Sequence, residues 1–138
     1  MTSDGDAWHQ PLQHVEGGEL SEATAQSSGM RRFEAISSAM TGSSRIWMGE
    51  THVAGGHASA DHHHGDSETG IYVVVGHPEF VFLVDGVETR IHASPGDYVF
   101  VPPYTPHREE NPGDEEAVVV LARSSQEAIV VNLASLHG

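Results

Sequence analysis

Three histidines and a glutamate near the middle of the chain have the residue types and spacing of a metal site. His62 and His64 lie two residues apart, so on a β-strand their side chains leave the same face and can point at one ion. Glu68 follows four residues after His64, and His107 follows a stiff, proline-rich loop. Three neutral imidazoles and a carboxylate suit iron, manganese, nickel, cobalt, copper or zinc better than calcium or magnesium. We therefore predict one divalent transition metal per chain, held by His62, His64, Glu68 and His107.

The neighbouring residues leave alternatives open. The run from His62 to His64 could be a polar loop, because a His-rich tract binds metal weakly without a built site. The presence of Glu68 and His107 favours a built site, and His63 is expected on the opposite strand face. If the strand continues past Glu68, Tyr72 shares its parity and would turn its phenol toward the metal. Tyr72 is therefore a candidate catalytic residue, with core packing as the alternative.

The segments that must position these residues are short and apolar. From Arg31 onward, apolar runs of four to seven residues alternate with Gly, Pro, Asp and Ser, which is typical of an all-β sandwich or barrel. Asp85-Gly86 between two such runs indicates a type I′ hairpin. Candidate strands cover residues 32–37, 45–53, 60–64, 71–75, 80–84, 88–93, 98–101, 117–123 and 128–133. We predict a polar N-terminal arm over residues 1–28 and one β-barrel domain over residues 29–138.

Composition excludes several classes of chemistry. The 138-residue chain has no cysteine, which excludes disulfides, thiolate metal sites and cysteine nucleophiles. All six basic residues are arginines, so Schiff-base and P-loop lysine chemistry are excluded as well. A formal net charge of −14 repels nucleic acid and anionic membrane surfaces. The acidic N-terminus has no apolar segment and no run is long enough to span a bilayer, so we expect a cytoplasmic protein.

The order of these residues resembles the two motifs of the cupin superfamily. The first motif is matched by Gly56, His62, His64, Glu68 and Gly76, although seven residues separate Glu68 from Gly76 where the motif has six. The second motif is matched by Gly96, Pro102, His107 and Asn111, with Tyr104 in place of a glycine. The resemblance implies a double-stranded β-helix barrel of the jelly-roll kind, a metal near one mouth, small-molecule chemistry and frequent dimerisation.

The predicted function is that of a metal-dependent cupin acting on a small metal-chelating molecule. Four protein ligands would leave about two adjacent positions open on a six-coordinate ion, as catalytic metals require. Those positions could serve a dioxygenase, or a non-redox isomerase, decarboxylase or lyase. The alternatives are a non-catalytic module that binds a small ligand through its metal, and a metal-free, epimerase-like cupin.

Two further expectations concern charge and assembly. Arg31 and Arg32 could reach a substrate carboxylate from the arm, whereas paired arginines on an acidic surface are usually solvated. Arg45 is expected on the exterior of the barrel. Apolar segments at 117–121 and 128–133 need covering and favour a homodimer.

Overall fold

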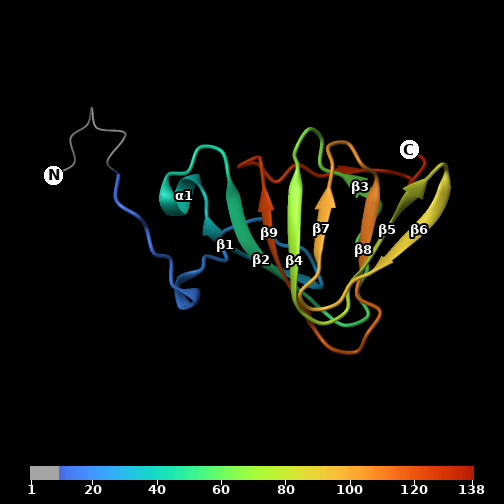
Figure 1. The fold of residues 1–138 in the computed structure, drawn as a ribbon, viewed down its shortest axis with the longest axis horizontal. Coiled ribbons are helices and arrows are strands. Elements are labelled where there is room, and N and C mark those ends of the chain that lie inside the picture. Colours follow the sequence, from blue (N-terminus) through green and yellow to red (C-terminus); the bar gives the residue numbers. More distant parts are fainter. Residues whose placement is uncertain (1–9) are drawn as a thin grey trace.

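The computed structural model describes residues 10–138 and consists of two antiparallel β-sheets with almost no helix (Figure 1). One sheet has the order β1-β2-β9-β4-β7 and the other β10-β3-β8-β5-β6. The strands are β1 (Met30–Ile36), β2 (Trp47–Val53), β3 (His62–His63), β4 (Thr69–Val75), β5 (Glu79–Val84), β6 (Val87–His92), β7 (Tyr98–Val101), β8 (His107–Glu110), β9 (Ala117–Arg123) and β10 (Val131–Asn132). This arrangement confirms the predicted all-β, jelly-roll class, although the two sheets do not close into a continuous barrel.

Within residues 10–138, helical structure is confined to two short elements before β2. A 3-10 turn, η1, covers Gly17–Glu19, and the single-turn helix α1 covers Ser38–Thr41. The Ser37 hydroxyl accepts a hydrogen bond from the Met40 N–H at 3.0 Å and so caps the start of α1. No helix among the described residues is long or apolar enough to cross a bilayer.

Alternating burial along the strands sets which side chains enter the space between the sheets. In β2 every second residue is buried, beginning with Trp47, and in β4 the buried positions begin with Thr69 and Ile71. A core of six buried residues fills one end of this space: Ile71, Val73, Phe80, Ala93, Val101 and Val119. Ile71 and Val119 also line a cavity, so the cavity begins where the core ends.

In the described part of the chain two non-glycine residues have positive φ, and both lie in tight turns. Asp85 (φ 50°), followed by Gly86 (φ 76°), connects β5 to β6 directly after the Val84–Val87 pair, which confirms the predicted hairpin. Tyr104 has φ 57°, so it adopts a left-handed conformation at the position where the motif has a glycine. Its N–H donates to the Gly65 carbonyl at 2.7 Å, which joins the loop before β8 to the loop after β3.

Asn111 holds together the loops at one end of the sheets. The side chain is 3% exposed, and its Nδ2 donates to the carbonyls of Val53, Ala54 and Glu115 at 3.0, 3.3 and 2.8 Å. The amide therefore joins backbone groups at the end of β2 to the segment before β9.

The described part of the N-terminal arm runs beside β1. Ser21 pairs with Glu34, and Ser27 pairs with Met30, through isolated β-bridges. The side chain of Gln26 binds both backbone groups of Arg32, accepting from its N–H at 2.8 Å and donating to its carbonyl at 2.7 Å. Residues 20–28 thus contact the first sheet, while residues 1–9 of the predicted arm lie outside the described part of the chain.

Candidate metal centre

Three of the four predicted ligands come together between the sheets. His62 lies in β3 and pairs with His107 of β8, while His64 follows β3 directly. One ring nitrogen from each of the three histidines lies within 4.8 Å of those of the other two. Because three imidazole nitrogens converge at this spacing, the cluster could hold one metal ion.

Backbone carbonyls orient all three rings. The Nδ1 atoms of His62, His64 and His107 lie 2.6, 2.8 and 2.9 Å from the carbonyl oxygens of Ala60, Ile129 and Thr105. A carbonyl can only accept, so each Nδ1 carries the proton and each Nε2 keeps its lone pair. This is the usual outer support of a metal-bound histidine.

His107 has an unused ligand atom. Its Nε2 is buried and makes no hydrogen bond to any described residue, and the side chain is 3% exposed. Leaving a buried polar atom without a partner costs free energy, and a bound metal ion would supply that partner. The donor set and its support therefore fit a transition metal.

Burial keeps two of the imidazoles neutral at physiological pH. Desolvation lowers the pKa of His64 to about 4, opposed in part by its hydrogen bond to the Ile129 carbonyl. Desolvation also lowers the pKa of His107 to about 4, opposed by the Thr105 carbonyl. Since a metal binds only the neutral ring, these shifts prepare both side chains as ligands.

The structure does not bring Glu68 or Tyr72 to the histidines. Glu68 immediately precedes β4, whose inward positions begin with Thr69, so the Glu68 side chain lies on the outer face and is exposed. Its backbone is fixed there by Ser124, whose N–H donates to the Glu68 carbonyl at 3.0 Å. Tyr72 does share parity with Glu68, and its ring packs outside against Tyr98 at 4.8 Å. Strand alternation thus excludes both side chains from the interior.

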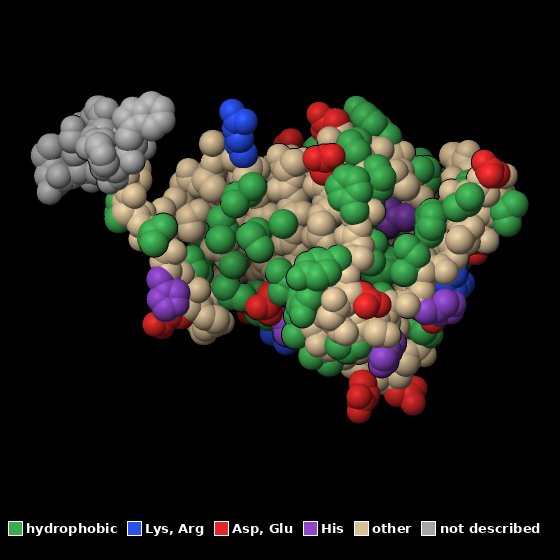
Figure 2. Space-filling view, in the orientation of Figure 1, with side chains coloured by type: hydrophobic (Ala, Val, Ile, Leu, Met, Phe, Trp, Pro, Cys, Tyr) green, Lys and Arg blue, Asp and Glu red, His purple; other side chains and the backbone are tan. Residues whose placement is uncertain are grey.

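The outer face of β4 and β7 is apolar. Tyr98 and Phe100 are 80% and 60% exposed, and Figure 2 shows hydrophobic side chains gathered over these strands. Tyr72 belongs to this surface and is 36% exposed, so its surroundings differ from those of the cavity.

The histidines open into a cavity of about 460 Å³ between the two sheets. His62, His64 and Glu109 line one side, and Trp47, Thr69 and Arg123 line the other. Residues 24–28 of the arm and residues 128–130 after β9 complete the wall. The cavity therefore combines candidate metal ligands, apolar surface and charged groups.

Glu109 is a carboxylate that sequence reasoning missed. It lies two residues after His107 in β8 and so shares the inward face, and its negative charge acts on His64. Its N–H donates to the Ser59 hydroxyl at 2.9 Å. Among the described residues that line the cavity, Glu109 is the only acidic one. The parity argument used for His62 and His64 would have found it, had 107–110 been predicted as a strand.

Arg123 is the second charged residue that the sequence did not single out. Its guanidinium carbon lies 3.9 Å from the centre of the Trp47 ring. Its Nε and Nη2 donate to the carbonyls of Ser125 and Gln126, each at 2.9 Å. Burial lowers the pKa of Arg123, and the nearby charge of Arg32 acts in the same direction.

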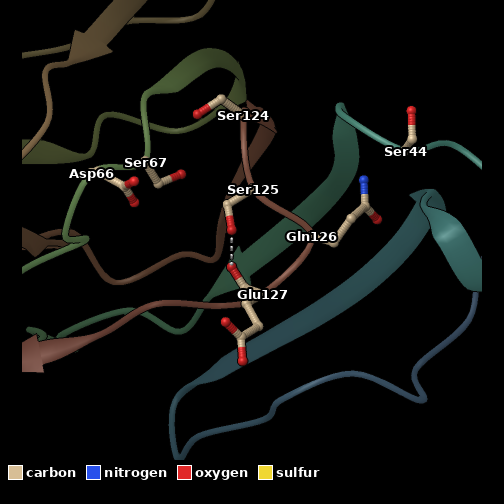
Figure 3. Close-up of a pocket in the computed structure, with 7 residues that line it drawn as sticks. All are labelled: Ser44, Asp66, Ser67, Ser124, Ser125, Gln126 and Glu127. Atoms are coloured by element: carbon tan, nitrogen blue, oxygen red, sulfur yellow. Dashed lines mark hydrogen bonds between the residues drawn. The ribbon is translucent and has the colours of Figure 1, made fainter.

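The loop that holds Arg123 separates the cavity from a shallow polar depression on the outer surface. That depression is lined by Ser44, Asp66, Ser67, Ser124, Ser125, Gln126 and Glu127 (Figure 3). Ser67 borders both hollows. The depression contains no histidine and no arginine among the described residues that line it, so the chemistry of the site belongs to the cavity.

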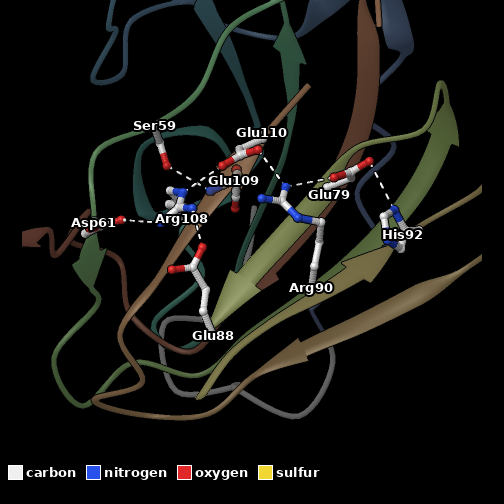
Figure 4. A network of polar contacts seen from close by, with 9 residues as sticks. All are labelled: Ser59, Asp61, Glu79, Glu88, Arg90, His92, Arg108, Glu109 and Glu110. Atoms are coloured by element: carbon white, nitrogen blue, oxygen red, sulfur yellow. Dashed lines mark hydrogen bonds and ion pairs between the residues drawn. The ribbon is translucent and has the colours of Figure 1, made fainter. Parts of the chain in front are cut away.

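An ion-pair network on the outer face secures β8 (Figure 4). Arg108 lies between His107 and Glu109 in sequence and therefore points outward, where it contacts Glu110 at 2.7 Å and Glu88 at 2.8 Å. Arg108 also contacts Asp61 beside β3 at 3.3 Å. Hydrogen bonds from Arg108 and Arg90 lower the pKa of Glu110. The network links β3 and β8, the strands that carry His62 and His107.

Comparison with known proteins identifies the family. Residues 49–123 match the model of the Cupin domain family, which is more than half of the chain, and this protein belongs to that family. A search of curated proteins gives no match.

Solved structures agree with this assignment. An oxalate decarboxylase OxdC from Bacillus subtilis is 26% identical with a TM-score of 0.68, covering 80% of this chain and 29% of the other. That decarboxylase contains Mn(II) centers. The polyketide cyclase RemF from Streptomyces resistomycificus is 18% identical with a TM-score of 0.72, covering 91% and 87%. This chain therefore spans less than a third of the decarboxylase, and its likeness to RemF shows the fold alone.

Proposed function

We propose that this protein is a metal-dependent cupin that binds one divalent transition metal through His62, His64 and His107 and acts on a small metal-chelating molecule. The observation that carries the proposal is the unpartnered Nε2 of His107, in a ring whose Nδ1 is already held by a carbonyl. The same support at His62 and His64 points their Nε2 atoms to a common ion. Without Glu68, this ligand set consists of three neutral imidazoles.

A three-histidine set favours catalysis over a closed structural site. A tetrahedral ion with three protein ligands keeps one position open, and a six-coordinate ion keeps three. An ion there would act as a Lewis acid toward a chelating oxygen of the ligand. Glu109 faces the same cavity near His64, so its carboxylate could accept a proton from the bound molecule. This pairing supports a non-redox isomerase, decarboxylase or lyase as the first candidate.

The dioxygenase activity and the non-catalytic binding module remain the alternatives. Both would use the same histidines, and a binding module would not need Glu109. Homodimerisation and a cytoplasmic location also remain predictions; light scattering of the purified protein tests the first of these.

Metal analysis of protein prepared without a His-tag tests the proposal. We expect close to one transition metal ion per chain in the wild type and a loss of most of it in His107→Ala. Glu68→Gln and His63→Ala should keep their metal, because Glu68 is exposed and the His63 Nδ1 accepts a hydrogen bond from the Gly65 N–H. Equal metal loss in His63→Ala and His107→Ala would indicate an unstructured His-rich tract and contradict the proposal.

A further inference from the structure

We propose that the cavity binds a small organic acid and that Arg123 holds a carboxylate of this ligand, on the side opposite the histidines. The inference rests on the proposed function and deepens it, because it names the chemical class of the ligand. Arg123 would be a binding residue, and Arg32 would add positive charge beside it.

The position of Arg123 in the sheet directs it inward. In the register of the first sheet, Arg123 of β9 lies between Trp47 of β2 and Thr69 of β4. Both of these neighbours are buried and line the cavity. The row formed by Trp47, Arg123 and Thr69 thus faces the opposing sheet, which carries His62, His107 and Glu109.

The contacts of Arg123 orient its guanidinium and leave part of it free. The Trp47 ring covers one face, and the carbonyls of Ser125 and Gln126 accept from Nε and Nη2. Nη1 makes no hydrogen bond to any residue from 10 to 138. A planar guanidinium with free N–H groups in a preset orientation is suited to bind a carboxylate.

The charged residues that line the cavity also favour a carboxylate ligand. Arg31, Arg90 and Arg108 on the surface pair with carboxylates. Arg32 and Arg123 line the cavity and, within the described chain, make no ion pair, although the protein has twenty acidic residues. Glu34, the acidic residue whose charge acts on Arg123, accepts a hydrogen bond from the Trp47 Nε1 at 3.1 Å. The cavity lining itself carries two cations and one carboxylate, Glu109, and the nearby Glu34 supplies a second negative charge.

A bound metal would create an excess of positive charge. Three neutral imidazoles leave the charge of a divalent ion uncompensated, so the ion and the two arginines exceed the charges of Glu109 and Glu34. A ligand with one or two carboxylates would balance them, because buried charges are stable only when paired. The cavity volume of about 460 Å³ lies within the range of small-molecule sites.

The test compares acids that differ in one charge. The probes are malate, 2-hydroxyglutarate and 2-hydroxyadipate, each paired with the analogue whose distal carboxylate is a carboxamide. The hydroxy-acid end of every probe can chelate metal, and the series varies the reach to Arg123. Dissociation constants are measured by calorimetry on Mn(II)-loaded wild type, Arg123→Gln, Arg123→Lys and Arg45→Gln. Metal content is measured in every sample.

In the wild type, at least one diacid should bind about ten- to hundredfold more tightly than its amide, as expected for a charged hydrogen bond. Arg123→Gln should bring this ratio close to one without changing the metal content. Arg123→Lys keeps the charge but lacks the planar fork, so the ratio should fall and stay above one. Arg45→Gln removes the same charge from an exposed position and should leave the ratio unchanged.

A wild-type ratio near one for all three pairs would overturn the proposal, as would a ratio that survives both Arg123 variants. If Arg123→Gln fails to fold, the affinity ratios of the wild type and of Arg123→Lys still test the proposal. A chain that binds the diacid through Arg123 but holds no metal would refute only the proposed function. A metal-loaded chain that does not distinguish acid from amide would refute only the acid site.

Discussion

The metal-free protein should lose stability in mild acid because of two buried histidines. His64 and His107 have pKa values of about 4 in the folded state, against 6.5 for an ordinary histidine. Between these values the unfolded chain binds protons that the folded chain does not. Their stabilising contribution is therefore complete above pH 6.5 and is lost as the pH falls toward 4.

The size of the effect follows from the two shifts. At pH 5 an unfolded histidine is almost fully protonated, whereas a folded one with a pKa of about 4 is mostly neutral. The difference costs about 2 kcal/mol of unfolding free energy for each histidine between pH 7.5 and pH 5, or about 4 kcal/mol together.

Urea denaturation with a chelator present measures this loss. The wild type is compared with His64→Gln/His107→Gln, which lacks both titrating groups, and with His92→Gln, whose side chain is 72% exposed. The double variant should lose about 4 kcal/mol less than the wild type between pH 7.5 and pH 5, and His92→Gln should behave like the wild type. If the wild type and the double variant lose the same free energy, the burial argument for these histidines is refuted.

Three other predictions concern the framework. Asn111→Ala should lower the unfolding free energy by about 1–3 kcal/mol in urea denaturation, because the carbonyls of Val53, Ala54 and Glu115 lose the donor that the buried Asn111 side chain supplies; an unchanged midpoint would contradict this. Gly76→Ala should destabilise more than Gly86→Ala, since both have positive φ but only at Gly76 would the new Cβ lie 2.9 Å from the Ala117 Cβ; equal melting temperatures would refute the packing argument. Removing residues 1–19 should leave the melting temperature nearly unchanged. Removing residues 1–28 also deletes part of the cavity wall and should weaken ligand binding. Equal ligand binding by the two truncated proteins would contradict a role of residues 20–28 in the cavity.

Sequence pattern predicted the fold well where apolar alternation was strong. Strands β2, β4, β5 and β9 fall close to their predicted ranges, and the Asp85-Gly86 turn has the expected conformation. Strand β8 was missed because its sequence is polar on both faces. His107 is buried and Glu109 faces the cavity, while Arg108 and Glu110 form ion pairs outside. Hydrophobic periodicity cannot reveal such a strand.

The metal site was predicted only in part, because the direction of a side chain depends on where its strand begins. Local spacing placed His62 and His64 on one face, and the second motif identified His107. The position of Glu68 depended on where β4 begins, and a shift of one residue reverses the direction of a side chain. The seven residues between Glu68 and Gly76 were a signal, since a spacing of six intervening residues before Gly76 leads to the inward Thr69. Arg123 could not be predicted, because its role depends on contacts with Trp47 and with a loop carbonyl.

The wall of the cavity has a consequence for how this protein can diversify. The three histidines lie within residues 49–123, the segment shared with other cupins. Residues 24–28, Arg32 and residues 128–130, which also enclose the cavity, lie outside that segment. Part of the cavity wall is therefore encoded outside the stretch that carries the histidines, whereas Arg123 lies at the end of that stretch. Insertions or exchanges in either flank can change the molecule that is accepted while the shared segment keeps its chemistry.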